Sequence, residues 1–127
     1  AVDGLIDESG LTADLLAEYG GPGGIVAFAG AARPNEIGQI ARRVTAAAEA
    51  GDANAVFLMR GAAACLLQSL ERMGWTPDSA LCLTGGIGPH YTSYMPAAAR
   101  DALTEPQGAP LAGAIALAQS FRKEQVA

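Results

Sequence analysis

The chain has 127 residues and a formal net charge of −5 at pH 7, and 50% of its residues are hydrophobic. This length corresponds to about one domain with its own hydrophobic core. The acidic balance and the absence of any lysine or arginine cluster argue against nucleic acid as a partner. Alanine is abundant and aromatic residues are few, which predicts a tightly packed and mostly helical domain.

No stretch approaches about 18 uninterrupted apolar residues, and no basic segment followed by a hydrophobic run stands at the N-terminal end. We therefore expect a soluble, cytoplasmic protein with no membrane partner. The two cysteines, Cys65 and Cys82, lie inside apolar runs and lack the spacing of metal ligands. They are expected to be buried core thiols in a reducing compartment, with no disulfide needed.

The first predicted helix covers residues 13 to 19, with Thr12 as its N-cap. The following sequence Gly-Gly-Pro-Gly-Gly, residues 20 to 24, should be a flexible connection because four glycines and a proline disfavour both helix and strand. Residues 25 to 32 are too few to classify by periodicity, and we assign them to a short helix.

Two long helices follow almost back to back, over residues 34 to 50 and 53 to 73. Gly51 should end the first helix, Asp52 should cap the second, and Gly74 should end it. Each helix carries an apolar stripe at i, i+3, i+4 spacing. The residues expected to face the core are Ile37, Ile40, Ala41, Val44 and Ala48, then Val56, Met59, Ala63, Leu66, Leu67, Leu70 and Met73.

The run Ala-Leu-Cys-Leu-Thr, residues 80 to 84, is bounded by turn residues and predicts a short buried strand. Residues 91 to 103 should be helical with an interruption at Pro96, residues 104 to 110 a loop, and residues 111 to 122 a terminal helix. The residues of that helix expected to face inward are Leu111, Ala114, Ile115, Ala118 and Phe121. The predicted fold class is α/β and predominantly helical, with few strands, in a single domain covering all 127 residues.

The predicted strand runs into Gly85 and Gly86, and Gly88 follows after one residue. Glycines at this point let the backbone adopt positive φ and let a ligand lie against the peptide planes. A following helix start would add free N–H groups, so a nucleotide fits the pattern. The alternative is a tight turn in which strand and helix pack closely, and the local pattern leaves both open.

Few other residues suit catalysis. Lys123 is the only lysine, so the chain has no GxxxxGK[ST] phosphate loop. His90, the only histidine, is a candidate base or sugar contact, or else a solvent-facing loop residue. Glu49 fits a solvated helix charge, and Arg60 fits a surface ion pair better than a phosphate contact. No catalytic constellation is visible.

Three segments resemble the C-terminal half of N-acetylglucosamine and glucosamine kinases. They are the helical stretch from AARPNEIGQIARRV to ERMGW, the strand with its glycines LCLTGGIG, and PQGAPLAGAIALAQ. Those kinases belong to the BadF/BadG/BcrA/BcrD ATPase family, within the sugar kinase, Hsp70 and actin superfamily. The similarity covers residues 11 to 121, and the order of the three segments makes it fairly specific.

The resemblance implies an ATP-dependent kinase that transfers the γ-phosphoryl group to a hydroxyl of an amino sugar with Mg²⁺. In such enzymes two ribonuclease-H-like (actin-like ATPase) domains close around the nucleotide, and this chain is similar to the C-terminal one. The resemblance assigns adenosine contacts to Thr84, Gly85 and Gly86, and more loosely to Ile87 and Gly88.

The family's N-terminal phosphate loop and catalytic aspartate have no counterpart in this chain. Phosphoryl transfer needs Mg²⁺, positioned phosphates and an aligned nucleophile, and the chain supplies none of these groups. The resemblance therefore implies half of a two-domain kinase whose N-terminal half is absent, inactive alone and binding nucleotide weakly at best. Gly113 would be a close-packing position in the terminal helix.

A different interpretation is a non-catalytic helical module for assembly, for example a homodimer formed through apolar helix surfaces. The two interpretations differ in whether Gly85 and Gly86 line an open cleft or are covered by Trp75 and the terminal helix. A third would make the chain an activator of acyl-CoA dehydratases, which bind an iron–sulfur cluster through cysteines, but the two cysteines lack suitable placement. Which sugar is phosphorylated is left open.

Overall fold

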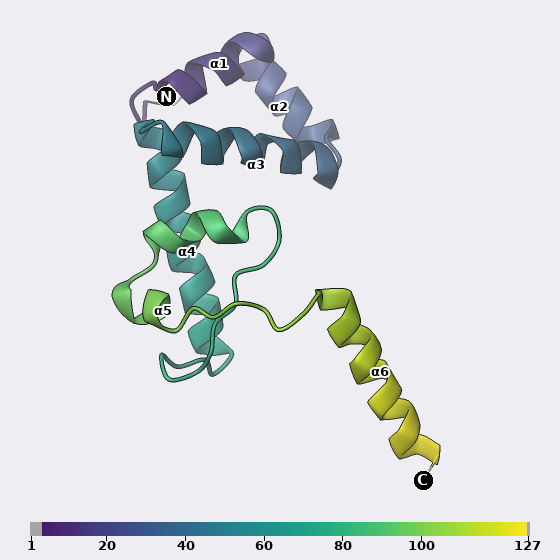
Figure 1. Ribbon diagram of the computed structural model, residues 1–127. Coiled ribbons are helices and arrows are strands. Elements are labelled where there is room, and N and C mark those ends of the chain that lie inside the picture. Colours follow the sequence, from purple (N-terminus) through teal and green to yellow (C-terminus); the bar gives the residue numbers. More distant parts are fainter. Residues whose placement is uncertain (1–3, 127) are drawn as a thin grey trace.

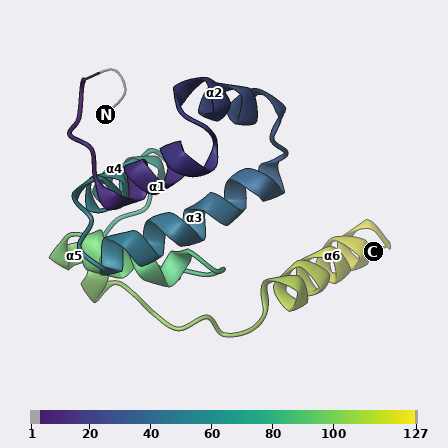
Figure 2. The same cartoon turned by 90° about the horizontal axis from the view of Figure 1, so that it is seen from above.

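The computed structural model describes the backbone of residues 4 to 126 and the side-chain surroundings of residues 4 to 122. In chain order the helices are α1 (Gly10–Glu18), α2 (Pro22–Ala31), α3 (Pro34–Glu49), α4 (Ala53–Arg72), the 3₁₀ helix η1 (Gly88–Tyr94), α5 (Ala97–Asp101) and α6 (Pro110–Val126). Helices α1 and α3 meet one end of α4, α2 packs against α1 away from α4, and η1 and α5 lie along the other half of α4 (Figure 1). Helix α6 projects away from both groups (Figure 2).

Helix α1 begins earlier than the sequence predicts, because Ser9 and not Thr12 is its N-cap. The Ser9 hydroxyl accepts a hydrogen bond from the Thr12 N–H at 3.5 Å, and the Thr12 hydroxyl accepts one from the Ser9 N–H at 2.8 Å. This reciprocal pair is a capping box with threonine at its third helical position. The prediction that Thr12 is the N-cap is wrong, because Thr12 lies within the first turn of the helix and its hydroxyl accepts the N–H of the actual N-cap, Ser9.

The Gly-Gly-Pro-Gly-Gly segment is a turn followed by the start of a helix. Gly20 and Gly21 have positive φ angles of 73° and 91°, which turn the chain after α1. Pro22 then opens α2, because its fixed φ suits the first helical position. A Cβ on Gly24 would lie 1.5 Å from the carbonyl oxygen of Tyr19, so only glycine fits there. The predicted flexible connection is therefore wrong for the last three residues of the segment.

Helices α3 and α4 match the two predicted long helices and form the main core where they meet. Leu11 of α1, Ala48 of α3, and Ala55 and Met59 of α4 are buried together. Asp52 links these helices: its carboxylate accepts the N–H of Ala55 at 3.0 Å and the N–H of Leu11 at 2.9 Å. The prediction that Asp52 caps the second long helix is confirmed.

Much of the apolar surface of α4 is exposed. Its buried residues are Ala55, Met59 and Ala63, whereas Leu66 and Met73 from the predicted stripe are 40% and 82% exposed. Leu67 and Leu70 of the same stripe are half-buried and pack against Leu81, Met95 and Ala99. The predicted stripe is therefore correct in part. Among the described helices, α4 is the one long and apolar enough to cross a bilayer by length and composition, a test that core helices of water-soluble proteins also pass.

The strand predicted over residues 80 to 84 is not formed. Leu81 makes one isolated parallel bridge with Leu103, in which the Leu81 N–H donates to the Ala102 carbonyl at 2.9 Å and the Thr104 N–H to the Leu81 carbonyl at 2.8 Å. Within the described residues no second extended segment runs alongside to continue the pairing. The described chain is thus predominantly helical, as predicted, without the few strands that the α/β class requires.

A second, smaller core lies near that bridge, where Leu81, Met95 and Ala99 are buried together. The predicted interruption at Pro96 is confirmed, because η1 ends before it and α5 begins after it. The chain around it differs from the predicted helix, since the first piece is a 3₁₀ helix that begins at Gly88.

Helix α6 forms as predicted, but the prediction that one side of it faces inward is wrong. All five residues expected to face inward are exposed: Leu111, Ala114, Ile115, Ala118 and Phe121. The connection of residues 104 to 109 carries α6 away from the other helices (Figures 1 and 2). Gly113 is not a close-packing position, because a Cβ there would have nothing within 4 Å.

Candidate functional site

Two of the three glycines after the predicted strand are explained by the course of the backbone. Gly85 has a φ of 81°, in the region that other residues rarely adopt. Gly88 begins η1 close to the preceding chain, and a Cβ on it would lie 3.1 Å from the carbonyl carbon of Leu83. The tight-turn interpretation therefore applies to Gly85 and Gly88.

Gly86 has neither of these reasons to be a glycine. Its φ is not positive, and a Cβ placed on it would have no described atom within 4 Å. Gly86 is also exposed. The packing of the described residues therefore does not require a glycine at this position, and the same is true of Gly108.

Four of the five predicted site residues line one cavity, which we call the glycine cavity. Thr84, Gly86, Ile87 and Gly88 lie on one side of it, and Leu66, Leu70, Tyr91 and Met95 are among the residues that complete it. Gly85 belongs to the adjoining turn and not to the lining. The cavity volume is 510 Å³, within the range of about 300–1,000 Å³ typical of small-molecule pockets.

The chemistry of the glycine cavity suits an uncharged ring. The described residues that line it are mostly apolar and include no charged side chain. The hydroxyl groups of Thr84 and Tyr91 and the backbone of the loop are its hydrogen-bonding groups. Nothing in this lining neutralises a phosphate, and no group of three or more metal-ligating side chains gathers in the described part of the chain.

Neither Trp75 nor α6 belongs to the lining of the glycine cavity. Trp75 packs against the second core, and its indole N–H donates to the Ser79 carbonyl at 3.2 Å. The sequence leaves open whether Gly85 and Gly86 line an open cleft or are covered by Trp75 and the terminal helix. Neither Trp75 nor α6 covers the cavity; Gly86 lines it and Gly85 does not. Leu66 and Leu70 of α4 also line the cavity, although the sequence predicts them only as core residues. Their spacing of four positions places them on the same face of the helix, and this was the one sequence feature that linked them.

Both cysteines are exposed, so the prediction of buried core thiols is wrong. Side chains alternate in direction along extended backbone, and the burial of Leu81 turns Cys82 outward. The Cys82 sulfur lies 3.3 Å from the Thr104 hydroxyl oxygen. Cys65 lies on a face of α4 that no described helix covers.

His90 lies on η1 but does not line the glycine cavity. Its Nδ1 lies 2.8 Å from a carboxylate oxygen of Glu49, at the end of α3. The sequence interpretations, His90 as a solvent-facing residue and Glu49 as a solvated charge, did not include this contact between the two side chains. The two residues are 41 positions apart, and no local pattern connects them. Arg60 is exposed on α4 and pairs with no described carboxylate.

No protein-family model, no curated protein and no solved structure matches the chain. The likeness to sugar kinases therefore depends on the three sequence segments alone.

Proposed function

We propose that this chain is the adenosine-contacting C-terminal domain, of ribonuclease-H-like type, of a cytoplasmic ATP-dependent kinase that phosphorylates glucosamine or N-acetylglucosamine. The observation that carries the proposal is the glycine cavity. The residues that resemble the adenosine wall of those kinases line it together, namely Thr84, Gly86, Ile87 and Gly88. An adenine ring needs an apolar slot with a few polar groups, and this lining supplies both.

Each part of the cavity has a role in this proposal. Gly86 leaves room for adenosine to approach the backbone, and Leu66 and Leu70 contact the flat face of the base. The Thr84 hydroxyl offers a hydrogen bond to the base or ribose. The described residues offer no ligand set for Mg²⁺. Mg²⁺, the phosphates and the sugar are therefore held by the other domain, and the chain alone has no turnover.

The test is to combine this chain with a separately produced N-terminal half of a related glucosamine kinase and to follow ADP formation with glucosamine or N-acetylglucosamine. We expect ADP release that depends on the sugar and that Gly86→Val abolishes. Gly108→Val is the matched control, because Gly108 also lacks positive φ and has nothing within 4 Å of its Cβ position. No activity in a complex shown to have assembled would contradict the proposal.

A second candidate function is a helical assembly module that forms a homodimer. The observation in its favour is the exposed apolar surface, such as Phe57 and Leu58 on α4, which are 67% and 52% exposed. Sedimentation of this chain over a range of concentrations would show a dimer that Phe57→Ser dissociates. A monomer at all concentrations would remove this candidate and leave the kinase proposal untouched.

A further inference from the structure

The glycine loop, by which we mean residues 84 to 87, supplies three residues to the lining of the glycine cavity but is held by few contacts. Thr84, Gly85 and Gly86 are exposed. Among the described residues, the one hydrogen bond from the loop to a neighbouring element is donated by the His90 N–H to the Ile87 carbonyl oxygen, at 3.0 Å. A segment with so few contacts opens easily, so the shape of the loop depends on how firmly His90 is held.

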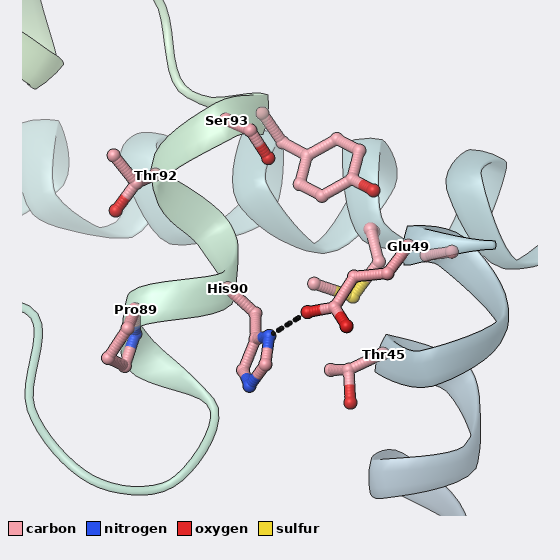
Figure 3. Close-up of a pocket in the computed structure, with 9 residues that line it drawn as sticks. Thr45, Glu49, Pro89, His90, Thr92 and Ser93 are labelled. Atoms are coloured by element: carbon pink, nitrogen blue, oxygen red, sulfur yellow. Dashed lines mark hydrogen bonds and ion pairs between the residues drawn. The ribbon is translucent and has the colours of Figure 1, made fainter. Parts of the chain in front are cut away.

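The side chain of His90 is attached to α3. Its Nδ1 atom lies 2.8 Å from Oε1 of Glu49, the last residue of α3, and the two side chains point toward one another (Figure 3). A carboxylate only accepts hydrogen bonds, so the Nδ1–H of His90 is the donor. Ala48, next to Glu49, is buried in the main core between α3 and α4, which fixes the backbone at this end of the helix.

The other contacts of η1 lie further from the loop. Tyr91 and Tyr94 pack against the main core, whereas Pro89, at the beginning of η1, is exposed. His90 is thus the first residue of η1 whose side chain bonds to another described element. It connects the loop to α3 through two hydrogen bonds, one from its backbone to Ile87 and one from its side chain to Glu49.

The strength of this attachment depends on the charge of the imidazole. His90 is the only histidine, and histidine is the side chain whose ordinary change of charge falls between about pH 5 and about pH 8. The pair stands at the rim of a cavity whose other described lining residues, from α3, α4 and η1, include no charged residue. Tyr94 is the one further titratable residue there, and tyrosine is neutral in this range. At about pH 5.5, where glutamates are still ionised, the contact is an ion pair, and at about pH 8 it is a weaker hydrogen bond from a neutral imidazole.

We propose that Glu49 is a positioning residue that acts through His90 to hold the glycine loop in the shape that lines the glycine cavity, most firmly when both side chains are charged. The side chains of His90 and Glu49 are 37% and 65% exposed, so the pair changes the ratio of anchored to released loop by only about two- to fivefold. For ligand binding the inference rests on the proposed function, but the anchoring of the loop can be measured without a ligand.

The test is hydrogen exchange of the His90 amide in the whole chain, measured by NMR and expressed as protection relative to the unfolded rate at the same pH. This amide makes the bond to Ile87, so its protection reports how often the loop is released. In the natural chain we expect protection to be about two- to fivefold higher at about pH 5.5 than at about pH 8. Glu49→Gln should lower the protection and remove its dependence on pH, while the amide of Met59 in the main core should be unaffected.

Two further variants separate the charge of the pair from its hydrogen bond. His90→Asn keeps a side-chain N–H donor near the position of Nδ1 but is never charged. We expect His90→Asn to match the natural chain at about pH 8 and to show no rise in protection at about pH 5.5. Glu71→Gln removes an exposed carboxylate from the last turn of α4 and should behave like the natural chain at both pH values.

The consequence for the ligand is measured with adenosine, which has no phosphate that titrates in this pH range. The Kd for adenosine at about pH 5.5 should be about two- to fivefold higher in Glu49→Gln than in the natural chain, because only the anchored loop lines the cavity. If the natural chain binds no adenosine but the protection of His90 responds as expected, the proposed function fails and this inference stands. Protection that is unchanged in Glu49→Gln, or that keeps its pH dependence there, would overturn the inference whether or not adenosine binds.

Discussion

Helices α4 and α6 are both rich in alanine and leucine, but they differ in what surrounds them. Helix α4 packs against α3 and α1 at one end and against η1 at the other, and it buries Ala55, Met59 and Ala63. Helix α6 follows an extended connection, and every side chain described on it is exposed. Local sequence is enough to form both helices, whereas burial depends on a neighbouring element.

The largest effect should come from the buried end of α4. Met59 is 4% exposed and belongs to the main core, so Met59→Ala leaves a cavity there. We expect a loss of about 2–3 kcal/mol in the free energy of unfolding, at the lower end of the range for such substitutions. Urea denaturation followed by circular dichroism measures it. A loss below about 0.5 kcal/mol, typical of surface sites, would mean that this core is not formed.

Asp52 allows the same region to be tested through pH. The N–H groups of Leu11 and Ala55 that bond to its carboxylate hold the pKa of Asp52 below its ordinary value. The pKa of Asp52 is therefore lower in the folded chain than in the unfolded chain. The hydrogen bonds to its carboxylate contribute fully to stability at pH values above 3.8, the ordinary pKa, and this contribution is lost as the pH falls through the folded-state pKa.

The corresponding experiment compares the free energy of unfolding of the natural chain and of Asp52→Asn as the pH falls from about 7 to about 3. The natural chain should be the more stable one at neutral pH, and the difference should shrink in acid. A difference that stays constant with pH would contradict the role given to the carboxylate.

The smallest effect should come from α6. Leu117 is 58% exposed, so Leu117→Ala removes little buried surface. The free energy of unfolding should change by less than about 0.5 kcal/mol, measured in the same urea series as Met59→Ala. A loss comparable to that of Met59→Ala would show that α6 is packed in solution, which would remove the contrast with α4.

The elements that the sequence predicts correctly have their determinants close by in the chain. The ends of α3 and α4 follow from Pro34, Gly51, Asp52 and Gly74, each of which acts within a turn of its own position. The failures depend on distant parts of the chain. The expected strand has one bridge because no second extended segment among the described residues accompanies it. The predicted inward side of α6 is exposed because no other described helix covers it.

The residues of the candidate site also fall into those that local sequence predicts and those that depend on distant parts of the chain. The loop from Thr84 to Gly88 was recognisable because its residues are consecutive, but the leucines of α4 that complete the cavity come from elsewhere in the chain. The contact of His90 with Glu49 depends on how η1 lies against α3, which no local pattern encodes. The structure also separates Gly86 from Gly85, which has a positive φ, and from Gly88, which lies close to Leu83.

The most direct test of the central claim is an NMR titration of this chain with AMP, with ribose 5-phosphate as the control that lacks the base. The proposed function predicts weak, saturating shifts at residues 84 to 88 and at Leu66 and Leu70 with AMP alone. Gly86→Val should remove these shifts without changing the rest of the spectrum, because its Cβ position is open, and Gly108→Val should retain them. Signals of the loop that do not respond to AMP, or that respond equally in Gly86→Val, would contradict an adenosine site in the glycine cavity.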